Sequence, residues 1–312
     1  MSRLPVVREP APQAVAPGGF GRNLPAMLTT TEFVLAAPAH GRPFAADATY
    51  LADGHAKPVV VFVHGFKGFK DWGHFPLLAR FFAEQGFVFI KLNLSHNGVV
   101  VGGTGDLEDL EAFGRNNFSL ELADLGHLLD QLHQPGATPL PPADLDLNHL
   151  FLVGHSRGGA LVLLWAAEDA RVRAVATWAS IADINQRWPR ATVRQWQKQG
   201  VLHVENTRTG QQLPLYFQLV EDYYRHRHRL NLARAVRHQL RQPLLLVHGD
   251  QDETVPVGAA EQLQALRPDA ELHVLPGVNH VFGGAHPWVP PELPASARQA
   301  AELTADFFRR QA

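Results

Sequence analysis

Cysteine is absent from this chain of 312 residues, and no apolar run reaches the length of about 18 residues that a membrane-spanning helix needs. The lack of cysteine excludes disulfide bonds, thiolate metal sites and a cysteine nucleophile, although it leaves the cellular compartment open. Residues 1–27 contain no apolar stretch of signal-peptide length. The default expectation is therefore a cytoplasmic protein without a membrane span.

A strong excess of either charge is also lacking. The chain has 28 Lys and Arg residues and 30 Asp and Glu residues, for a net charge of −2 at pH 7. This balance gives no electrostatic reason to expect binding to nucleic acid or to an anionic membrane. Hydrophobic residues make up 46% of the chain and charged residues 19%, which is typical of a globular protein with a sizeable core. We expect a small-molecule substrate, and a homodimer stays open.

The N-terminal part of the chain predicts an irregular arm followed by a hairpin. Residues 1–28 are rich in Pro, Ala and Gly. Two strand-like stretches follow at 31–37 and 43–51, separated by a short turn segment that contains proline and glycine. The β-branched run at 59–63 comes next and is typical of a strand that is buried on both faces.

Strand and helix patterns then alternate to the end of the chain. Strands are predicted at 87–94, 150–153, 174–179, 244–247 and 271–275. Helices are predicted at 71–85, 119–132 (with Ser119 as its cap), 160–167, 258–266 and 295–310. Alternation of this kind, entered through a hairpin, predicts an α/β fold with a mostly parallel central sheet and helices on both faces.

One segment, 181–242, interrupts this alternation. Its roughly 60 residues lie between two consecutive predicted strands, where roughly 15–20 would be enough for a crossover helix. It predicts a small hairpin within 201–215 and a helix over 216–229. An insertion after the carboxyl end of a strand lies over the ligand crevice of an open α/β sheet. We therefore expect 29–180 and 243–312 to form the core and the insertion to form a lid. A decorative subdomain or a dimer contact is the alternative.

The stretch from His149 to Ala160 predicts a strand, a sharp turn and a helix, with Gly-His-Ser-Arg-Gly at the turn. A G-x-S-x-G pattern in this context is typical of a nucleophile elbow, where a serine occupies the apex of a strained turn. At Gly154 and Gly158 a side chain would collide with the tight crossing of strand and helix. Ser156 is therefore the candidate nucleophile, and the alternative is an ordinary glycine-rich turn.

A serine hydroxyl is a poor nucleophile at neutral pH, so Ser156 would need a neighbouring base. His280 is the candidate base, because it lies on a loop directly after a predicted strand. The chain contains 17 histidines, and the rivals of His280 are His286 and His273.

The base in turn needs an acid that orients it. The loop after the predicted strand at 244–247 lies at the edge of the crevice and offers Asp250, Asp252 and, as a poorer candidate, Glu253. Turn formation and helix capping are the alternative roles of these residues. The residues alone leave the choice between the two aspartates open.

Acyl transfer also requires two backbone N–H groups that face the developing negative charge. One would belong to Arg157, immediately after the nucleophile. The other would belong to the loop after the strand at 59–63, where Phe66 is the first candidate and Lys67 the second. His64 at the end of this strand is better explained as a residue that braces the loop than as a base.

These motifs together resemble those of the serine α/β-hydrolases, and the resemblance covers residues 55–312. It rests on His64-Gly65, the elbow Gly-His-Ser-Arg-Gly-Gly, His-Gly-x-x-Asp-x-x-Val-Pro at 248–256, and His280. The sequence Phe-Lys-Gly-Phe-Lys-Asp-Trp at 66–72 and the insertion are similar to dienelactone-hydrolase-related esterases, including bacterial cinnamoyl and feruloyl esterases.

The resemblance implies an α/β-hydrolase fold with Ser156, His280 and Asp252 as the catalytic residues. It implies that carboxylic esters are cleaved through an acyl-enzyme, and no metal or organic cofactor is required. A peptidase, an amidase or a thioesterase would use the same side chains, and a non-catalytic binding protein on this scaffold is a further alternative. Three tryptophans are candidates for the substrate pocket, although packing explains them equally well: Trp72, Trp188 and Trp196.

Overall fold

The computed structural model describes residues 27–185 and 188–312. The strands in these ranges are β1 (Met27–Ala36), β2 (Pro43–Ala52), β3 (Lys57–Val63), β4 (Val88–Leu92), β5 (Leu145–His155), β6 (Val172–Trp178), β7 (Val201–Asn206), β8 (Gln211–Tyr216), β9 (Leu244–Gly249) and β10 (Glu271–Leu275). The helices are α1 (Phe75–Glu84), α2 (Leu110–Arg115), α3 (Phe118–His133), α4 (Arg157–Ala166), α5 (Arg190–Gln199), α6 (Gln218–Arg225), α7 (Leu232–Arg234), α8 (Gly258–Leu266) and α9 (Ala295–Arg309). Two single turns complete the set, a 3₁₀ turn η1 (Pro142–Asp144) and a π turn η2 (Ala235–Gln239).

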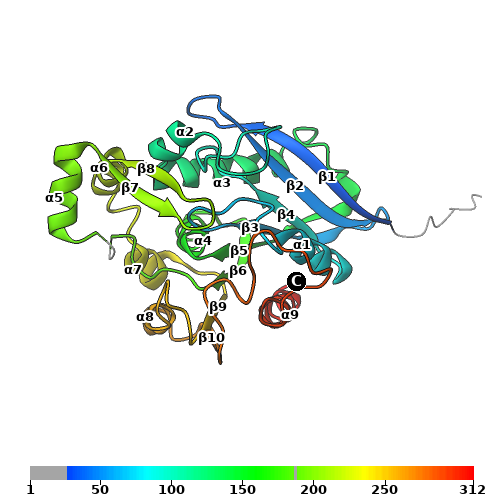
Figure 1. Ribbon diagram of the computed structural model, residues 1–312. Helices are drawn as coiled ribbons and strands as arrows, with labels where there is room; N and C mark the ends of the chain where they lie inside the picture. The colour runs from blue at the N-terminus through cyan, green and yellow to red at the C-terminus, as the bar shows by residue number, and fades with distance from the viewer. Residues whose placement is uncertain (1–26, 186–187) are drawn as a thin grey trace, which may run out of the picture.

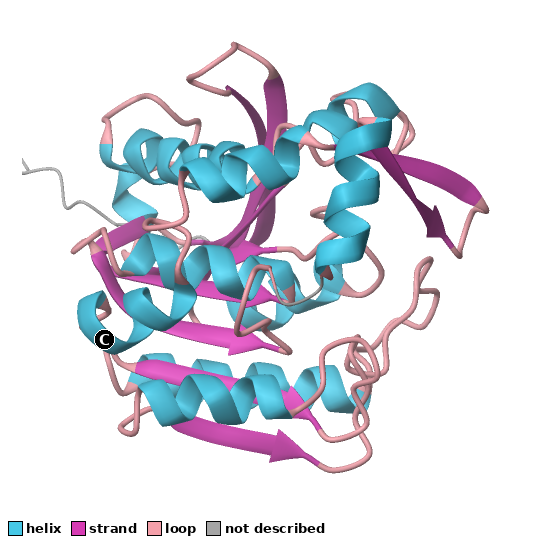
Figure 2. Cartoon of the chain, turned by 90° about the vertical axis from the view of Figure 1, so that its left-hand side faces the viewer, coloured by secondary structure: helices cyan, strands magenta, loops and turns pink. Residues whose placement is uncertain are grey.

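The central sheet is mostly parallel. Within the described ranges its strand order is β1-β2-β4-β3-β5-β6-β9-β10 (Figure 1). The strands from β4 to β10 in this order are parallel, and their arrowheads point the same way in Figure 2. The hairpin of β1 and β2 pairs antiparallel with the edge strand β4. This arrangement confirms the predicted α/β fold.

Helices cover both faces of the sheet (Figure 2). Strand β5 shows why both faces are apolar, because its side chains alternate between the two sides. Leu150 and Leu152 join the cluster under α3, α4 and α8, whereas Phe151 and Val153 join the cluster under α1 and α9. All four side chains are completely buried. The sheet is therefore a rigid support for the loops at its carboxyl ends, where ligands bind in open α/β folds.

The segment between β6 and β9 contains α5, β7, β8, α6, α7 and η2. Strands β7 and β8 form a separate antiparallel pair that lies to one side of the central sheet, at the left in Figure 1. Gln218 in this segment donates a hydrogen bond of 3.0 Å to the carbonyl oxygen of Asn116 and accepts one of 2.8 Å from Asn117. The Lys67 ammonium group donates to the carbonyl oxygen of Glu205 at 3.3 Å. The segment therefore contacts the loops that follow β3 and β4.

Three expectations about helix boundaries are wrong. The helix predicted from residue 71 begins only at Phe75, because the preceding residues form a loop and Pro76 favours a helix start at this point. The cap of α3 is Asn117, whose side chain accepts the Leu120 N–H at 2.9 Å, and Ser119 lies inside the first turn. The helix predicted over 216–229 spans only α6, because Tyr216 closes the β7–β8 hairpin.

Two further differences concern short elements. Strand β1 starts at Met27, so the last two residues of the predicted arm belong to the sheet, and the rest of the arm (1–26) lies outside the described residues. Helix α2 was not predicted, because its six residues are too few to show a helical period. Among the helices described, none is both long and apolar enough to cross a membrane.

Candidate active site

Ser156 lies at the apex of a tight turn between β5 and α4. Its backbone angles are φ 56° and ψ −117°, a conformation that side chains rarely adopt. A Cβ atom added to Gly154 would lie 2.2 Å from the Gly158 carbonyl oxygen, and one added to Gly158 would lie 2.1 Å from the Val63 carbonyl oxygen. Neither position can hold a larger residue without moving the backbone. The turn is anchored by the Ser156 N–H, which donates to the Trp178 carbonyl oxygen at 2.8 Å.

Ser156, His280 and Asp252 form a hydrogen-bonded chain, although they come from three separate loops. The Ser156 hydroxyl oxygen lies 3.0 Å from Nε2 of His280. Nδ1 of the same ring lies 2.7 Å from Oδ2 of Asp252. Both distances fall within the range expected for a nucleophile, a base and its orienting acid. A serine hydroxyl in this position can transfer its proton to the imidazole.

Asp252 is surrounded by donors and has no exposed side-chain surface. Its Oδ1 accepts the N–H groups of Thr254 at 2.8 Å and Val255 at 2.7 Å, and its Oδ2 lies 3.3 Å from Nε2 of His248. Burial alone would raise the pKa of Asp252, but hydrogen bonds from His248, His280 and the Val255 amide hold it well below its usual range. The carboxylate is therefore ionised at neutral pH and can stabilise a protonated His280.

The rival residues of the sequence prediction occupy other places. Asp250 is exposed and accepts the Gly277 N–H at 2.7 Å, which is a turn-forming role. His286 accepts the Gly73 N–H at 2.8 Å and stacks near Trp72. His273 lies within the edge strand β10. None of these three contacts is with Ser156 or His280.

The loop after β3 passes directly beside Ser156. A Cβ atom added to Gly65 would lie 2.9 Å from Cβ of Ser156 and 3.4 Å from its hydroxyl oxygen, so only glycine allows this approach. Gly68 N–H donates to the Gly65 carbonyl oxygen at 3.0 Å and closes a turn that contains Phe66 and Lys67. Lys67 has a positive φ of 62°. The amides of this turn and of Arg157 therefore lie on the same side of the strand ends as the serine.

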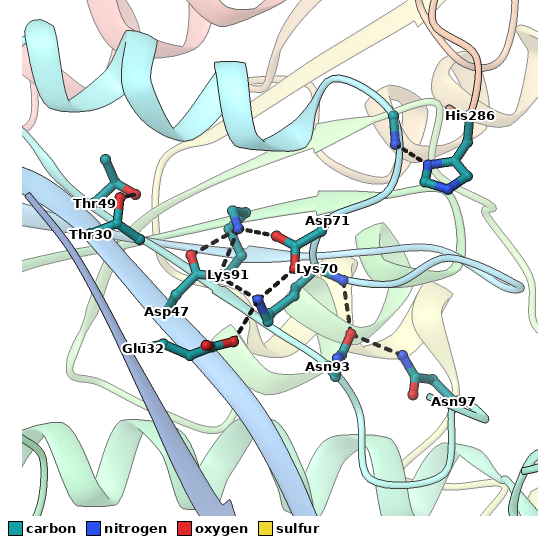
Figure 3. A network of polar contacts seen from close by, with 11 residues as sticks. Thr30, Glu32, Asp47, Thr49, Lys70, Asp71, Lys91, Asn93, Asn97 and His286 are labelled. Carbon is teal, nitrogen blue, oxygen red and sulfur yellow. Dashed lines mark hydrogen bonds and ion pairs between the residues drawn. The ribbon is translucent and has the colours of Figure 1, made fainter. Parts of the chain in front are cut away.

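His64 supports this loop from below. Its ring is 2% exposed, with Nδ1 2.9 Å from the Gly65 carbonyl oxygen and Nε2 3.3 Å from the amide nitrogen of Asn97. The Asn97 amide also reaches Oδ1 of Asn93 at 3.2 Å, and the same oxygen accepts the Lys70 N–H at 2.8 Å. Figure 3 shows the part of this arrangement that joins the loop to the segment after β4.

A cluster of charged side chains holds the far end of the loop to the sheet (Figure 3). The Lys70 ammonium group lies 2.8 Å from Oδ2 of Asp47 and also contacts Asp71. The Lys91 ammonium group lies 2.8 Å from Asp47 and 2.7 Å from Asp71. Burial would lower the pKa of Lys70, but the carboxylates of Asp47 and Asp71 raise it above its usual range. The loop is thus tied to β2 and β4 by paired charges.

The three tryptophans predicted for a pocket lie in two places. Trp196 is 1% exposed, donates to the Leu215 carbonyl oxygen at 2.7 Å and packs edge-on against Trp188 at 6.2 Å. This pair belongs to the interior of the segment between β6 and β9. Trp72 packs against Phe75, with ring centres 5.7 Å apart, at the start of α1. Packing accounts for the contacts of Trp196, and a pocket role for Trp72 and Trp188 stays a prediction.

Three residues near the serine were not identified from the sequence. His155 Nε2 donates to the His280 carbonyl oxygen at 2.8 Å and so holds the loop of the base. His248 contacts Asp252, as described above. Glu121 forms a buried ion pair with Arg157, at 2.8 Å. His155 and His248 lie inside the recognised motifs, whereas no local pattern links Glu121 to the elbow.

A buried histidine beside this region predicts a measurable loss of stability in acid. Burial lowers the pKa of His74 to about 4, and its ring is 2% exposed. Because the unfolded state binds a proton more readily, unfolding becomes easier as the pH falls from the usual histidine pKa of about 6.5 to about 4. Across this window we expect the free energy of unfolding of the His74→Gln variant to fall less steeply than that of the unmodified protein, by about 1.4 kcal/mol per pH unit. Urea titrations at successive pH values measure both slopes, and parallel curves would contradict the prediction.

Comparisons with known proteins bear on the whole chain. The model of a family described as the alpha/beta hydrolase family matches residues 60–290. No curated protein matches the sequence. Est1E from Butyrivibrio proteoclasticus has a similar structure, with a TM-score of 0.61 and 17% identity over 89% of this chain and 98% of Est1E.

Two further solved structures resemble the chain. The esterase domain of a Rhodothermus marinus protein gives a TM-score of 0.57 with 22% identity over 90% of this chain and 98% of that domain. A candidate dienelactone hydrolase from Klebsiella pneumoniae gives 0.55 with 18% identity over 90% and 99%. At these identities the likeness concerns the fold. In the described residues, no group of three or more His, Asp or Glu side chains is arranged to hold a metal ion.

Proposed function

The chain belongs to the alpha/beta hydrolase family, and we propose that it is a serine hydrolase that cleaves carboxylic esters through an acyl-enzyme intermediate. The observation that carries the proposal is the chain of short contacts from Ser156 through His280 to Asp252, at 3.0 and 2.7 Å. A surface serine has no need of a buried aspartate and a histidine in this order. The same arrangement activates a hydroxyl group for attack on an acyl carbon.

In the proposed reaction the Ser156 oxygen attacks the ester carbonyl carbon while His280 takes the hydroxyl proton. Asp252 keeps the imidazole in the required orientation and stabilises its positive charge. The carbonyl oxygen becomes an oxyanion that accepts hydrogen bonds from the amides of Arg157 and Phe66. Collapse of this intermediate breaks the bond to the alcohol oxygen, which receives the proton from His280. Water then gives a proton to His280, attacks the acyl-enzyme and releases the acid and the free serine.

We propose that the segment 181–242 is the lid of this site, and 29–180 with 243–312 its catalytic core. The support is the contact between the segment and the loops around the serine. Leu213 of β8 packs with Phe69, Leu107 and Phe113 in one apolar cluster. A wall built in this way would decide which acyl or alcohol group fits, because the core supplies the chemistry and the lid supplies shape.

Covalent labelling tests the function directly. A fluorophosphonate probe should form a stoichiometric adduct, and peptide mass spectrometry should locate it on Ser156. Stopped-flow hydrolysis of p-nitrophenyl acetate should show a burst of p-nitrophenol equal to the labelled fraction, because acylation precedes deacylation. A protein that neither labels nor turns over any ester would contradict the proposal and favour a binding role.

A substrate panel separates esters from the alternative substrates. The same acyl group should be offered as a methyl ester, a thioester and an anilide, so that only the leaving group varies. Hydroxycinnamate methyl esters belong in the panel, because a structure of Est1E has been solved with ferulic acid bound. We expect the highest kcat/KM with an ester. A higher value with the anilide would instead indicate an amidase or a peptidase.

A further inference from the structure

The side chain of Arg157 is buried beside the elbow, although the proposed reaction uses only its backbone N–H. The side chain is 9% exposed. Its Nε donates to Oε2 of Glu121 at 2.8 Å, and the other carboxylate oxygen accepts the Asn116 amide at 2.7 Å. Glu121 lies on α3, which is a different element from the elbow. The guanidinium group is therefore held by a carboxylate that is itself fixed.

Two aromatic rings enclose the same guanidinium group. Its central carbon lies 3.9 Å from the ring centre of Phe118 and 5.7 Å from that of Phe66. Both distances fall within the range of cation–π contacts, which become stronger when the cation is removed from water. The Phe66 ring is 36% exposed and packs on its other side against Phe113, with ring centres 5.5 Å apart. Arg157 is thus one of the few neighbours that hold this partly exposed ring.

The burial of this ion pair is costly. Arg157 Nη2 and Asn116 Oδ1 are both buried and have no hydrogen-bond partner among the described residues. A buried charge pair is often no more stabilising than apolar side chains of similar volume, and an unpaired polar atom adds a further cost. Stability therefore does not explain the pair well, and its position between two proposed oxyanion donors offers another reason for it.

We propose that the Arg157 side chain is a positioning residue that holds the two oxyanion-hole amides at the correct separation. One amide belongs to Arg157 and the other to Phe66, whose ring rests on the Arg157 guanidinium group. Glu121 and Phe118 fix that group from α3, so a displacement of the pair would move the Phe66 loop relative to the elbow. This inference rests on the serine hydrolase function proposed above.

The test uses variants that retain both backbone amides. Arg157→Gln removes the charge, Arg157→Lys keeps the charge but loses the planar face that contacts the rings, and Glu121→Gln weakens the anchor. Loss of a whole oxyanion donor costs about 10²- to 10³-fold in kcat, so misplacement should cost about 10- to 100-fold. The substrate is p-nitrophenyl acetate, whose small acyl group depends little on pocket shape. We expect kcat to fall and KM to stay within about threefold.

Active-site titration with the fluorophosphonate distinguishes positioning from mere folding. A purely structural role would lower the fraction of titratable sites and leave kcat per titrated site unchanged, and this result would overturn the proposal. If a single variant leaves a lone buried charge and fails to fold, the double variant Glu121→Gln/Arg157→Gln removes both charges together and is measured in the same way. Labelling of the unmodified protein at Ser156 is required first, because its absence would refute the function and not this inference.

Arg171→Gln is the matched control. Arg171 also lies in an arginine–carboxylate cluster, at 2.6 Å from Asp169 and 2.9 Å from Asp130, but it follows the far end of α4. Its kcat per titrated site should stay within about twofold of the unmodified protein. An equal fall in Arg171→Gln and Arg157→Gln would show a general effect of losing an ion pair and would overturn the proposal.

Discussion

Replacing Ser156 with alanine is expected to lower ester hydrolysis by at least about 10⁴-fold, because the acyl-enzyme can no longer form. Any residual rate would come from binding and from the oxyanion hole, which still accelerate attack by water. The measurement is kcat for p-nitrophenyl acetate at pH 7 to 8, with purified protein at concentrations high enough to detect slow turnover. The variant should also lose all labelling by the fluorophosphonate.

The fold should survive this substitution. The Ser156 hydroxyl has its printed contact with His280 only, and the turn is held by backbone groups and by glycines that remain. The circular dichroism spectrum and the midpoint of thermal unfolding should therefore stay close to those of the unmodified protein. Ser119→Ala, a serine at the start of α3, is the control and should keep full activity. Full activity in Ser156→Ala would refute the proposed nucleophile.

Replacing Asp252 with asparagine is expected to lower kcat by about 10⁴-fold, with little change in the position of His280. The carboxylate now accepts from Nδ1 of His280 at 2.7 Å, so Nε2 is free to take the serine proton. An asparagine can satisfy the Thr254 and Val255 amides with its oxygen, which turns its NH₂ group toward His280. The imidazole would then accept at Nδ1 and carry its proton at Nε2, which is the wrong tautomer for a base. The kcat of the purified variant for p-nitrophenyl acetate, compared with that of the unmodified protein, measures this loss.

Asp250→Asn is the matched control for this prediction. The two aspartates are two residues apart and both lie in the loop after β9, but Asp250 accepts only the Gly277 N–H. We expect Asp250→Asn to keep kcat within about threefold of the unmodified protein and to lose some stability, because a turn contact weakens. Loss of activity in Asp250→Asn together with normal activity in Asp252→Asn would reverse the assignment of the acid.

The two predictions also separate the roles in the hydrogen-bonded chain. Ser156→Ala removes the atom that forms the covalent bond, so it should abolish the burst as well as turnover. Asp252→Asn leaves the serine in place, and slow labelling by the fluorophosphonate should persist. A variant series that showed the opposite pattern would indicate that Asp252 acts on folding and not on His280.

The sequence by itself determined the order of elements and the positions of the reactive side chains in that order. Alternating apolar runs and short turn signals are local properties, so the parallel sheet and the elbow at Ser156 could be predicted from neighbouring residues. Helix ends were less accurate, because capping depends on one side chain, and Asn117 was overlooked in favour of Ser119.

Only the tertiary structure decided which distant groups meet. Asp250 and Asp252 are equally placed in the sequence, and the curvature of one loop brings Asp252 to His280 while Asp250 faces Gly277. The ion pair of Arg157 with Glu121 joins residues 36 positions apart. Such contacts depend on the strand order of the sheet and on the packing of α3 against α4, which no local pattern in the sequence contains. The elbow is therefore a property of neighbouring residues, whereas its partners are a property of the fold.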